Sequence, residues 1–313
     1  MKPKVSIIIP NYNHEAYLKK RIDSVLTQTY QNFEVIILDD CSTDRSYEII
    51  EGYRQHPIVS TINYNKQNSG SAFKQWKKGI ELAKGEWIWI AESDDFCTHD
   101  MLSRLIDNIG RCADVVLSYC QSFEVDENGN IKRDMSFHTD TIDTGHWKID
   151  YCINGEEEIR KYLLYINSIP NASGVIFRKS AYERADKSFG HMNLCGDWLL
   201  WIQLLKQGNV AYCATPLNRF REHTTTTRVL DTAAKIQKRL EEEYQVVMNI
   251  KDTVRFENDL LVKDRLDKLY LRYSNNYTNG QILKVLMNPF IYHKKIPLFK
   301  LLTAYIKNKF RHL

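Results

Sequence analysis

Four short apolar segments within the first 91 residues constrain the fold more than any other feature of this sequence. They are "KVSIIIP" (4–10), "FEVIIL" (33–38), "IVSTIN" (58–63) and "EWIWIA" (86–91). Nearly continuous Ile and Val indicate strands that are buried on both faces. The stretches between them, 14–29, 44–55 and 71–83, have apolar residues at helical spacing, with Gly85 expected as a C-terminal cap. This alternation predicts an α/β fold with a mostly parallel central sheet flanked by helices.

Polar residues follow three of these strands, at 11–13, 39–40 and 93–95. Ligands bind at the carboxyl ends of the strands in such sheets, so we expect these residues to share one site. The adjacent carboxylates of Asp94 and Asp95 suit a divalent cation, which takes oxygen ligands and offsets their mutual repulsion. Capping of the next helix is the alternative explanation, and the residues alone do not decide between the two.

Four further residues have an ordinary and a functional explanation each. Asp40 could cap a helix or accept hydrogen bonds from a base or ribose, and Tyr12 could pack in the core or stack on a base. Asp197 stands at the start of a predicted helix, where the helix dipole alone favours a carboxylate. His223 lies in a polar segment, where a lone histidine is usually a surface residue.

The rest of the chain is predicted to continue the sheet and then change character. Residues 219–227 show no core periodicity and are expected to form a loop. From about residue 229 long amphipathic helices replace the strand pattern, which places a domain boundary between 228 and 229 and makes 229–313 a helical appendage. The other predicted elements are strands at 114–120, 173–179 and 209–214, a hairpin turn at Asn128-Gly129, and helices at 156–166 and 197–208.

The net charge of +4 hides an asymmetry. The last 46 residues hold nine Lys or Arg and no acid, whereas residues 1–267 hold 34 basic and 39 acidic residues. Within this part, residues 296–313 form a basic amphipathic segment that could lie on an anionic membrane surface. Alternatively, it could pack on the catalytic domain or on a second subunit of a homo-oligomer. No recognised nucleic-acid-binding module accompanies the charge, so nucleic acid is not expected as a partner.

The compartment expected from the sequence is the cytoplasm, with attachment to the inner face of the plasma membrane if residues 296–313 bind lipid. The first apolar run is too short for a signal peptide, and no run is long enough to cross a bilayer. Seven cysteines, odd in number and without C-x-x-C spacing, favour reduced thiols over a disulfide framework or a zinc site.

Five segments occur in an order and spacing that match one known family. They are "VSIIIPNYNHEAYL" (5–18), "SVLTQTYQNFEVIILDDCSTD" (24–44), "NSGSAFKQWKKGIELAKGEWIWIAESDD" (68–95), "GDWLLW" (196–201) and "RFREH" (219–223). Through these segments, residues 4–228 resemble the inverting family 2 glycosyltransferases. The resemblance implies the GT-A fold, which is Rossmann-like, with nucleotide-sugar binding in residues 1–96 and acceptor binding in 97–228.

The resemblance also implies roles for individual residues. The expected contacts to the donor nucleotide are Pro10, Tyr12, Glu15, Asp40 and Asp94. Asp95 would bind Mn²⁺ or Mg²⁺, His223 would complete the metal shell or touch the diphosphate, and Asp197 would be the catalytic base. The chain departs from the family at Lys74, where many members have an Arg-Asn pair nearby, and at Gly196, where Glu is common. We expect Lys74 to take over a diphosphate or sugar contact.

The implied reaction moves a sugar from a nucleoside-diphosphate donor, UDP being the usual nucleotide, to an acceptor hydroxyl with inversion. A cation offsets the charge of the leaving diphosphate, and a carboxylate takes the proton of the acceptor. The acceptor would be a sugar on a lipid-linked or surface-polysaccharide intermediate. Two alternatives remain. The first is a sugar-nucleotide nucleotidyltransferase, which would need a Gly- and Lys/Arg-rich loop where this chain has "PNYNHEAYL". The second is a catalytically silent nucleotide-sugar-binding module.

Overall fold

The computed structural model describes residues 4–223, 232–255, 262, 265–266 and 306 of the chain. The chain divides into two compact units, Met1–Thr225 and Thr226–Leu313. The functional division expected from the sequence, at 96 and 228, stays a prediction. The basic segment 296–313 lies outside the described residues apart from Ile306, and so do residues 224–228.

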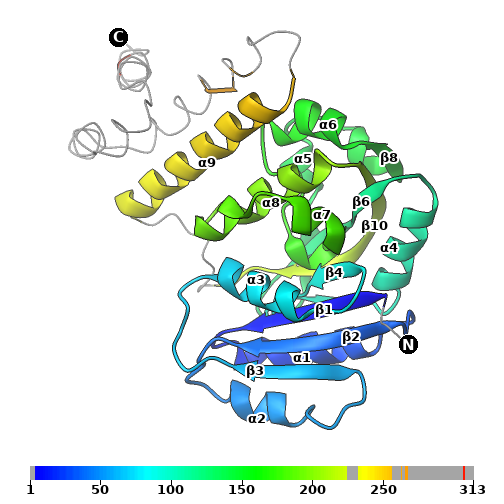
Figure 1. Ribbon diagram of the computed structural model, residues 1–313, viewed down its shortest axis with the longest axis vertical. Coiled ribbons are helices and arrows are strands. Elements are labelled where there is room, and N and C mark those ends of the chain that lie inside the picture. Colours follow the sequence, from blue (N-terminus) through cyan, green and yellow to red (C-terminus); the bar gives the residue numbers. More distant parts are fainter. Residues whose placement is uncertain (1–3, 224–231, 256–261, 263–264, 267–305, 307–313) are drawn as a thin grey trace. The chain divides into compact units, whose positions relative to one another are not determined.

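A mixed sheet of ten strands runs through the first unit (Figure 1), in the order β3-β2-β1-β4-β9-β6-β10-β5, with β7 on β6 and β8 on β10. The predicted strands β1 (Val5–Asn11), β2 (Phe33–Asp39), β3 (Val59–Tyr64) and β4 (Trp87–Ile90) are parallel neighbours. β9 (Val175–Arg178) is antiparallel to both β4 and β6 (Val115–Val125), and β10 (Asn209–Arg221) is parallel to β6. The carboxyl ends of β1, β2, β4, β6 and β10 therefore share one edge, and the α/β prediction is confirmed.

Helices cover both faces of this sheet because the side chains of β1 alternate between the faces. Ile7 and Ile9 lie in one core with Leu18 of α1 (Glu15–Leu26). Ile8 points the other way, against Gly79 of α3 (Ala72–Leu82), where an added Cβ would lie 2.4 Å from the isoleucine. Figure 1 shows α1 and α3 on opposite faces of the sheet.

The remaining elements of the first unit are mostly short. The helices are α2 (Ser46–Glu51), α4 (Met101–Gly110), α5 (Ser136–Thr139), α6 (Gly155–Glu158), α7 (Lys179–Arg184) and α8 (Gly196–Leu205). The 3₁₀ and π turns are η1 (His146–Lys148), η2 (Ile159–Leu163), η3 (Ala172–Gly174) and η4 (Lys187–His191). The short strands are β5 (Phe96–Cys97), β7 (Ile131–Asp134) and β8 (Tyr151–Asn154).

Three local expectations were wrong. Strand β10 extends to Arg221, where a loop was expected, because it pairs with β6 as far as Val125. The predicted helix 156–166 is α6 followed by the π turn η2 and ends at Leu163. Gly85 does not cap α3, since Ala83 after the helix is extended; glycine is required because a Cβ there would lie 2.5 Å from the Ser6 nitrogen.

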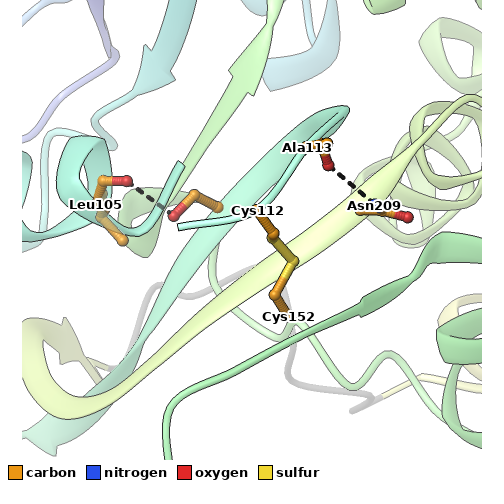
Figure 2. The surroundings of a disulfide bond; sticks show 6 residues. Leu105, Cys112, Ala113, Cys152 and Asn209 are labelled. Atoms are coloured by element: carbon orange, nitrogen blue, oxygen red, sulfur yellow. Dashed lines mark hydrogen bonds between the residues drawn. A yellow bond between two sulfur atoms is a disulfide. The ribbon is translucent and has the colours of Figure 1, made fainter. Parts of the chain in front are cut away.

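Two of the seven cysteines form a disulfide, so the expectation of reduced thiols was wrong for this pair. Cys112 follows α4, and Cys152 lies in β8, a strand that pairs with β10 (Figure 2). Their Cα atoms are 6.7 Å apart, within the reach of a disulfide, although 40 residues separate them in sequence. The other five cysteines are free. The bond removes the support that the cysteine pattern gave to a reducing compartment.

The described part of the second unit consists mainly of one helix, α9 (Ala233–Thr253). Thr232 caps it by accepting a hydrogen bond from the Lys235 amide. Within the same unit Arg265 forms an ion pair with Glu243 at 3.2 Å. Across the described parts of both units, no helix combines the length and the apolar character that crossing a bilayer requires.

Candidate active site

The sheet edge formed by the carboxyl ends of β1, β2, β4 and β10 collects most of the predicted side chains. Two residues other than glycine have positive φ at this edge, Asn13 after β1 (φ 55°) and Cys41 after β2 (φ 65°). Such backbone is uncommon outside glycine and clusters at functional sites. The Asn13 side chain holds the two turns together by accepting a hydrogen bond from the Thr43 amide at 2.7 Å.

The densest cluster at this edge contains His14, Asp94 and His223. One ligand atom of each residue lies within 4.8 Å of the other two. Asp94 Oδ2 is 3.0 Å from His223 Nε2, and Ser93 Oγ is 2.8 Å from His14 Nδ1. The three residues come from the β1–α1 turn, the tip of β4 and the end of β10. The structure therefore places Asp94, and not Asp95, beside His223.

The charge states of the cluster suit a cation. Burial lowers the pKa of His14 despite the opposing charge of Asp94, which favours the neutral imidazole that binds metals. Burial by itself raises the pKa of Asp94, but the His223 hydrogen bond and the attraction that either histidine exerts when it is protonated lower this pKa overall. Two imidazoles and one carboxylate form a donor set that fits Mn²⁺ better than Mg²⁺, which prefers oxygen ligands.

Asp95 has a different environment. Its side chain is 2% exposed, and its Oδ1 accepts a hydrogen bond from the Arg221 amide at 2.8 Å. Oδ2 accepts from Asn171 Nδ2 at 3.2 Å and lies 3.9 Å from the guanidinium of Arg21, which is fully buried. Burial and the charge of Asp94 raise the pKa of Asp95 to about 6, against the opposing effect of Arg21. Its role in metal binding stays a prediction.

Glu92 stands two residues before Asp94, is half-buried, and is held by hydrogen bonds. Trp76 of α3 donates to Glu92 Oε1 at 2.6 Å, and Arg21 Nε donates to the Glu92 carbonyl at 2.8 Å. Burial, followed by the charge of Asp94, raises the pKa of Glu92 to about 8. At neutral pH the metal-free site therefore holds one neutral carboxyl group beside the anionic Asp94.

Asp39, the last residue of β2, and Asp40, which follows it, make different contacts. Asp39 binds Asn11 and the turn at Ser42, so it fixes the β1 and β2 tips against each other. Asp40 organises the segment before α3. Its Oδ1 accepts from Asn65, the Ser69 amide and Gln75, and its Oδ2 accepts from the Ser69 hydroxyl at 2.7 Å. Because one oxygen carries three of the four bonds, Oδ2 keeps acceptor capacity for a further donor.

The other predicted nucleotide contacts surround this segment. Tyr12 is 45% exposed, as a base-stacking side chain must be, whereas Pro10 is buried within β1. Glu15 Oε2 accepts a hydrogen bond from the Arg45 amide at 2.6 Å, which ties the start of α1 to that of α2. Lys74 Nζ donates to the Ser69 carbonyl at 2.9 Å, so Lys74 and Asp40 both bind Ser69.

Asp197 lies in the first turn of α8, as the sequence indicates. Asn167 Nδ2 donates to its Oδ2 at 2.9 Å. The segment that carries Asn167 also carries Asn171, which binds Asp95, so a single connection between η2 and β9 contacts both carboxylates.

Sequence reasoning missed several residues of this site, among them His14, Arg21, Glu92 and Asn167. The signal for His14 was its position directly after the Asn11–Asn13 cluster. Glu92 was visible as a third acid at the tip of β4. Arg21 is one of several polar residues in the amphipathic helix α1, and Asn167 lies in an irregular segment. In the sequence alone, neither residue can be told apart from a surface residue.

Comparisons with known proteins assign the family. The model of "Glycosyl transferase family 2" matches residues 6–184, more than half of the chain. Glycosyltransferase GlyG of Streptococcus pneumoniae is 34% identical over 131 residues, which is 42% of this chain and 43% of that protein. The putative teichuronic acid biosynthesis glycosyltransferase TuaG of Bacillus subtilis is 36% identical over 106 residues, 34% of this chain and 42% of TuaG. The matched regions thus span less than half of these relatives.

Two solved structures align with nearly the whole chain. Residues 1–349 of S. aureus TarS in complex with UDP-GlcNAc align with a TM-score of 0.61 at 15% identity, covering 98% of this chain and 91% of TarS 1–349. The mannosyltransferase PcManGT of Pyrobaculum calidifontis, in complex with GDP-Man and Mn²⁺, aligns with a TM-score of 0.55 at 15% identity, covering 100% and 89%. These likenesses establish the GT-A fold, and the family match over residues 6–184 shows that the chain is a member of glycosyltransferase family 2.

Proposed function

We propose that this protein is an inverting, metal-dependent glycosyltransferase that moves a sugar from a UDP-sugar to an acceptor hydroxyl. The observation that carries the proposal is the cluster of His14, Asp94 and His223 at the sheet edge, where the strands present ligands. Family membership supports the reaction class, and the UDP-GlcNAc complex of TarS supports UDP as the nucleotide.

The residues around Asp40 would bind the nucleotide. Tyr12 offers an exposed ring for stacking on the base, and Asp40 Oδ2 has acceptor capacity for a base N–H. Glu15 and Pro10 shape the turns on either side, and Lys74 would supply positive charge toward the diphosphate.

Asp94, His223 and His14 would hold the metal, with Mn²⁺ preferred. Bound there, the ion would offset the negative charge that develops on the leaving diphosphate. Asp94 is the carboxylate closest to both histidines, so we assign it to the metal ahead of Asp95. Asp95 would support the metal site indirectly, because its hydrogen bond with the Arg221 amide fixes the end of β10 that leads to His223.

Asp197 would act as the base. An acceptor hydroxyl is a weak nucleophile at neutral pH, so a carboxylate must take its proton as it attacks the anomeric carbon from the side opposite the diphosphate. The single displacement inverts that carbon. The helix dipole at the start of α8 and the hydrogen bond from Asn167 both favour the anionic form that this role requires.

The biological setting that we propose is the synthesis of a cell-surface polysaccharide or lipid-linked glycan on the cytoplasmic side of the membrane. The similarity to TuaG and to the poly(ribitol-phosphate) β-N-acetylglucosaminyltransferase TarS of S. aureus supports the class of glycan. The acceptor would then be a sugar or polyol of the growing glycan.

A thermal-shift screen of UDP-, GDP-, dTDP- and CMP-sugars, each with and without Mn²⁺, tests the donor and metal together. A ligand at 100 times its Kd stabilises the folded protein by about 2.7 kcal/mol. We expect the largest rise in Tm with UDP-sugar plus Mn²⁺ and a loss of the Mn²⁺-dependent part in Asp94→Asn. Asp107→Asn, an exposed acid of α4, is the matched control. No shift with any nucleotide sugar would refute the proposal.

The two alternatives make different predictions in the same preparation. A nucleotidyltransferase would release pyrophosphate from a nucleoside triphosphate and a sugar 1-phosphate, whereas we expect none. A silent module would bind a UDP-sugar but neither transfer nor hydrolyse the sugar over a long incubation with Mn²⁺.

A further inference from the structure

The segment from Leu163 to Gly174, which leads from the end of η2 to β9, is hydrogen-bonded to both α8 and β4. Two tryptophans of α8 donate to its backbone, Trp198 to the Leu163 carbonyl at 2.9 Å and Trp201 to the Ile169 carbonyl at 3.2 Å. At its other end, Trp89 of β4 donates to the Ser173 carbonyl at 2.8 Å. The segment therefore connects the helix that carries Asp197 with β4, the strand that precedes Asp94 and Asp95.

Two asparagines of this segment each hold one carboxylate. Asn167 Nδ2 donates to Asp197 Oδ2 at 2.9 Å, and Asn171 Nδ2 donates to Asp95 Oδ2 at 3.2 Å. The side-chain oxygen of Asn171 is used within the segment, where it accepts from the Ser173 amide. Both side chains thus donate to acids on elements that the tryptophans have already fixed.

The backbone of Asn167 is restrained as well. Its carbonyl is 3.0 Å from His138 Nε2 of α5. Its side-chain oxygen is buried and has no hydrogen-bond partner among the residues that the structure describes. The opposite amide orientation would aim that oxygen at the Asp197 carboxylate, so the nitrogen must face the acid.

We propose that Asn167 is a positioning residue for the base. It fixes one rotamer of Asp197 at a set separation from the acids that follow β4, and so fixes where an acceptor hydroxyl must lie to reach both the base and the sugar donor. The inference rests on the proposed role of Asp197. A hydrogen bond to a charged group corresponds to about tenfold to a hundredfold in an equilibrium or a rate.

Two variants of one position test the role by activity. Asn167→Ala removes the donor, and Asn167→Asp keeps the shape but places a second carboxylate against Asp197. We expect kcat for sugar transfer to fall about tenfold to a hundredfold in the alanine variant and further in the aspartate variant, with KM for the UDP-sugar and its calorimetric Kd within about twofold of wild type. A role in packing alone would make the isosteric aspartate the milder change. The matched control is Asn209→Ala at the opposite end of β10. It removes a hydrogen bond from the side-chain amide to the Ala113 carbonyl and should keep wild-type kcat.

Crystal structures of wild type and Asn167→Ala give a readout that does not depend on turnover. We expect the Asp197 carboxylate to leave its wild-type rotamer or to occupy two. An unchanged rotamer overturns the inference, and so does an aspartate variant with wild-type kcat. A wild-type protein that turns over no nucleotide sugar instead refutes the proposed function, and the rotamer comparison still decides the positioning role.

Discussion

Arg21 provides the sharpest test of how the site is held in place. Its side chain is fully buried, and Nε donates to the Glu92 carbonyl at 2.8 Å. Its two terminal nitrogens have no hydrogen-bond partner within the described residues, and the closer one lies 3.9 Å from Asp95 Oδ2. The Arg21 charge therefore acts mainly on Asp95, which is also buried.

The expected magnitude follows from that distance. Two unit charges 3.9 Å apart interact by about 4 kcal/mol at an effective dielectric constant of about 20. Removal of one partner of a buried pair typically costs about 3–5 kcal/mol, because the other charge stays buried. We expect Arg21→Met to lower the free energy of unfolding by about that amount, and Asp95→Asn to lower it as well.

The double variant separates charge from packing. With both charges gone no uncompensated charge remains, so Arg21→Met with Asp95→Asn should lose at least about 2 kcal/mol less than the sum of the single losses. Urea unfolding followed by tryptophan fluorescence, at pH 7.5 with a chelator, measures all four proteins. The control is Arg111→Met, whose exposed pair with Asp150 should contribute less than about 1 kcal/mol. Additive losses within about 0.5 kcal/mol would refute the coupling.

Three further outcomes follow from the structure. Mn²⁺ binding, measured by calorimetry without nucleotide, should weaken about tenfold or more in His14→Ala and in Asp94→Asn, and wild-type affinity in the first variant would exclude His14 as a ligand. Burial raises the pKa of Glu158, against the opposing hydrogen bond from His146, so the folded state keeps a proton that the unfolded state loses above about pH 4.3. The stability that this group contributes is therefore full below that pH and falls as the pH rises. Glu158→Gln should flatten the decline in Tm measured from pH 5 to 8, and an unaltered slope would count against this effect. Thiol titration of the denatured, unreduced protein should find five thiols, and reduction of Cys112–Cys152 should lower the stability by about 2–4 kcal/mol, while seven thiols would mean that the bond does not form.

The sequence predicted the part of the molecule whose signals are local. The strands β1 to β4 were visible because each is a short apolar run, and their shared edge followed from the parallel arrangement. Asp94 and Asp40 could be proposed as site residues because they closely follow such runs. The antiparallel insertion of β9 and the length of β10 were not predicted, since a strand's direction and extent depend on partners that lie far away in the sequence.

The details of the site depend on contacts that no local pattern records. Asp94 and His223 are 129 residues apart, and their 3.0 Å approach exists only because β10 continues to Arg221 beside β6. The sequence could therefore name both residues through a family resemblance but gave no reason to pair His223 with Asp94 before Asp95. Asn167 and Asp197 are likewise joined only when α8 packs on the segment after η2.

In the proposed reaction, one sheet edge holds a nucleotide sugar while Asp197 removes the proton of the acceptor. The most direct measurement is single-turnover transfer from a UDP-sugar with Mn²⁺ by wild type and Asp197→Asn, alongside the UDP affinity of both proteins. We expect a rate lower by about 10²–10⁴-fold in the variant, with unchanged UDP affinity. An unchanged transfer rate would contradict the assignment of Asp197, and a parallel loss of UDP affinity would contradict the separation of donor binding from proton transfer.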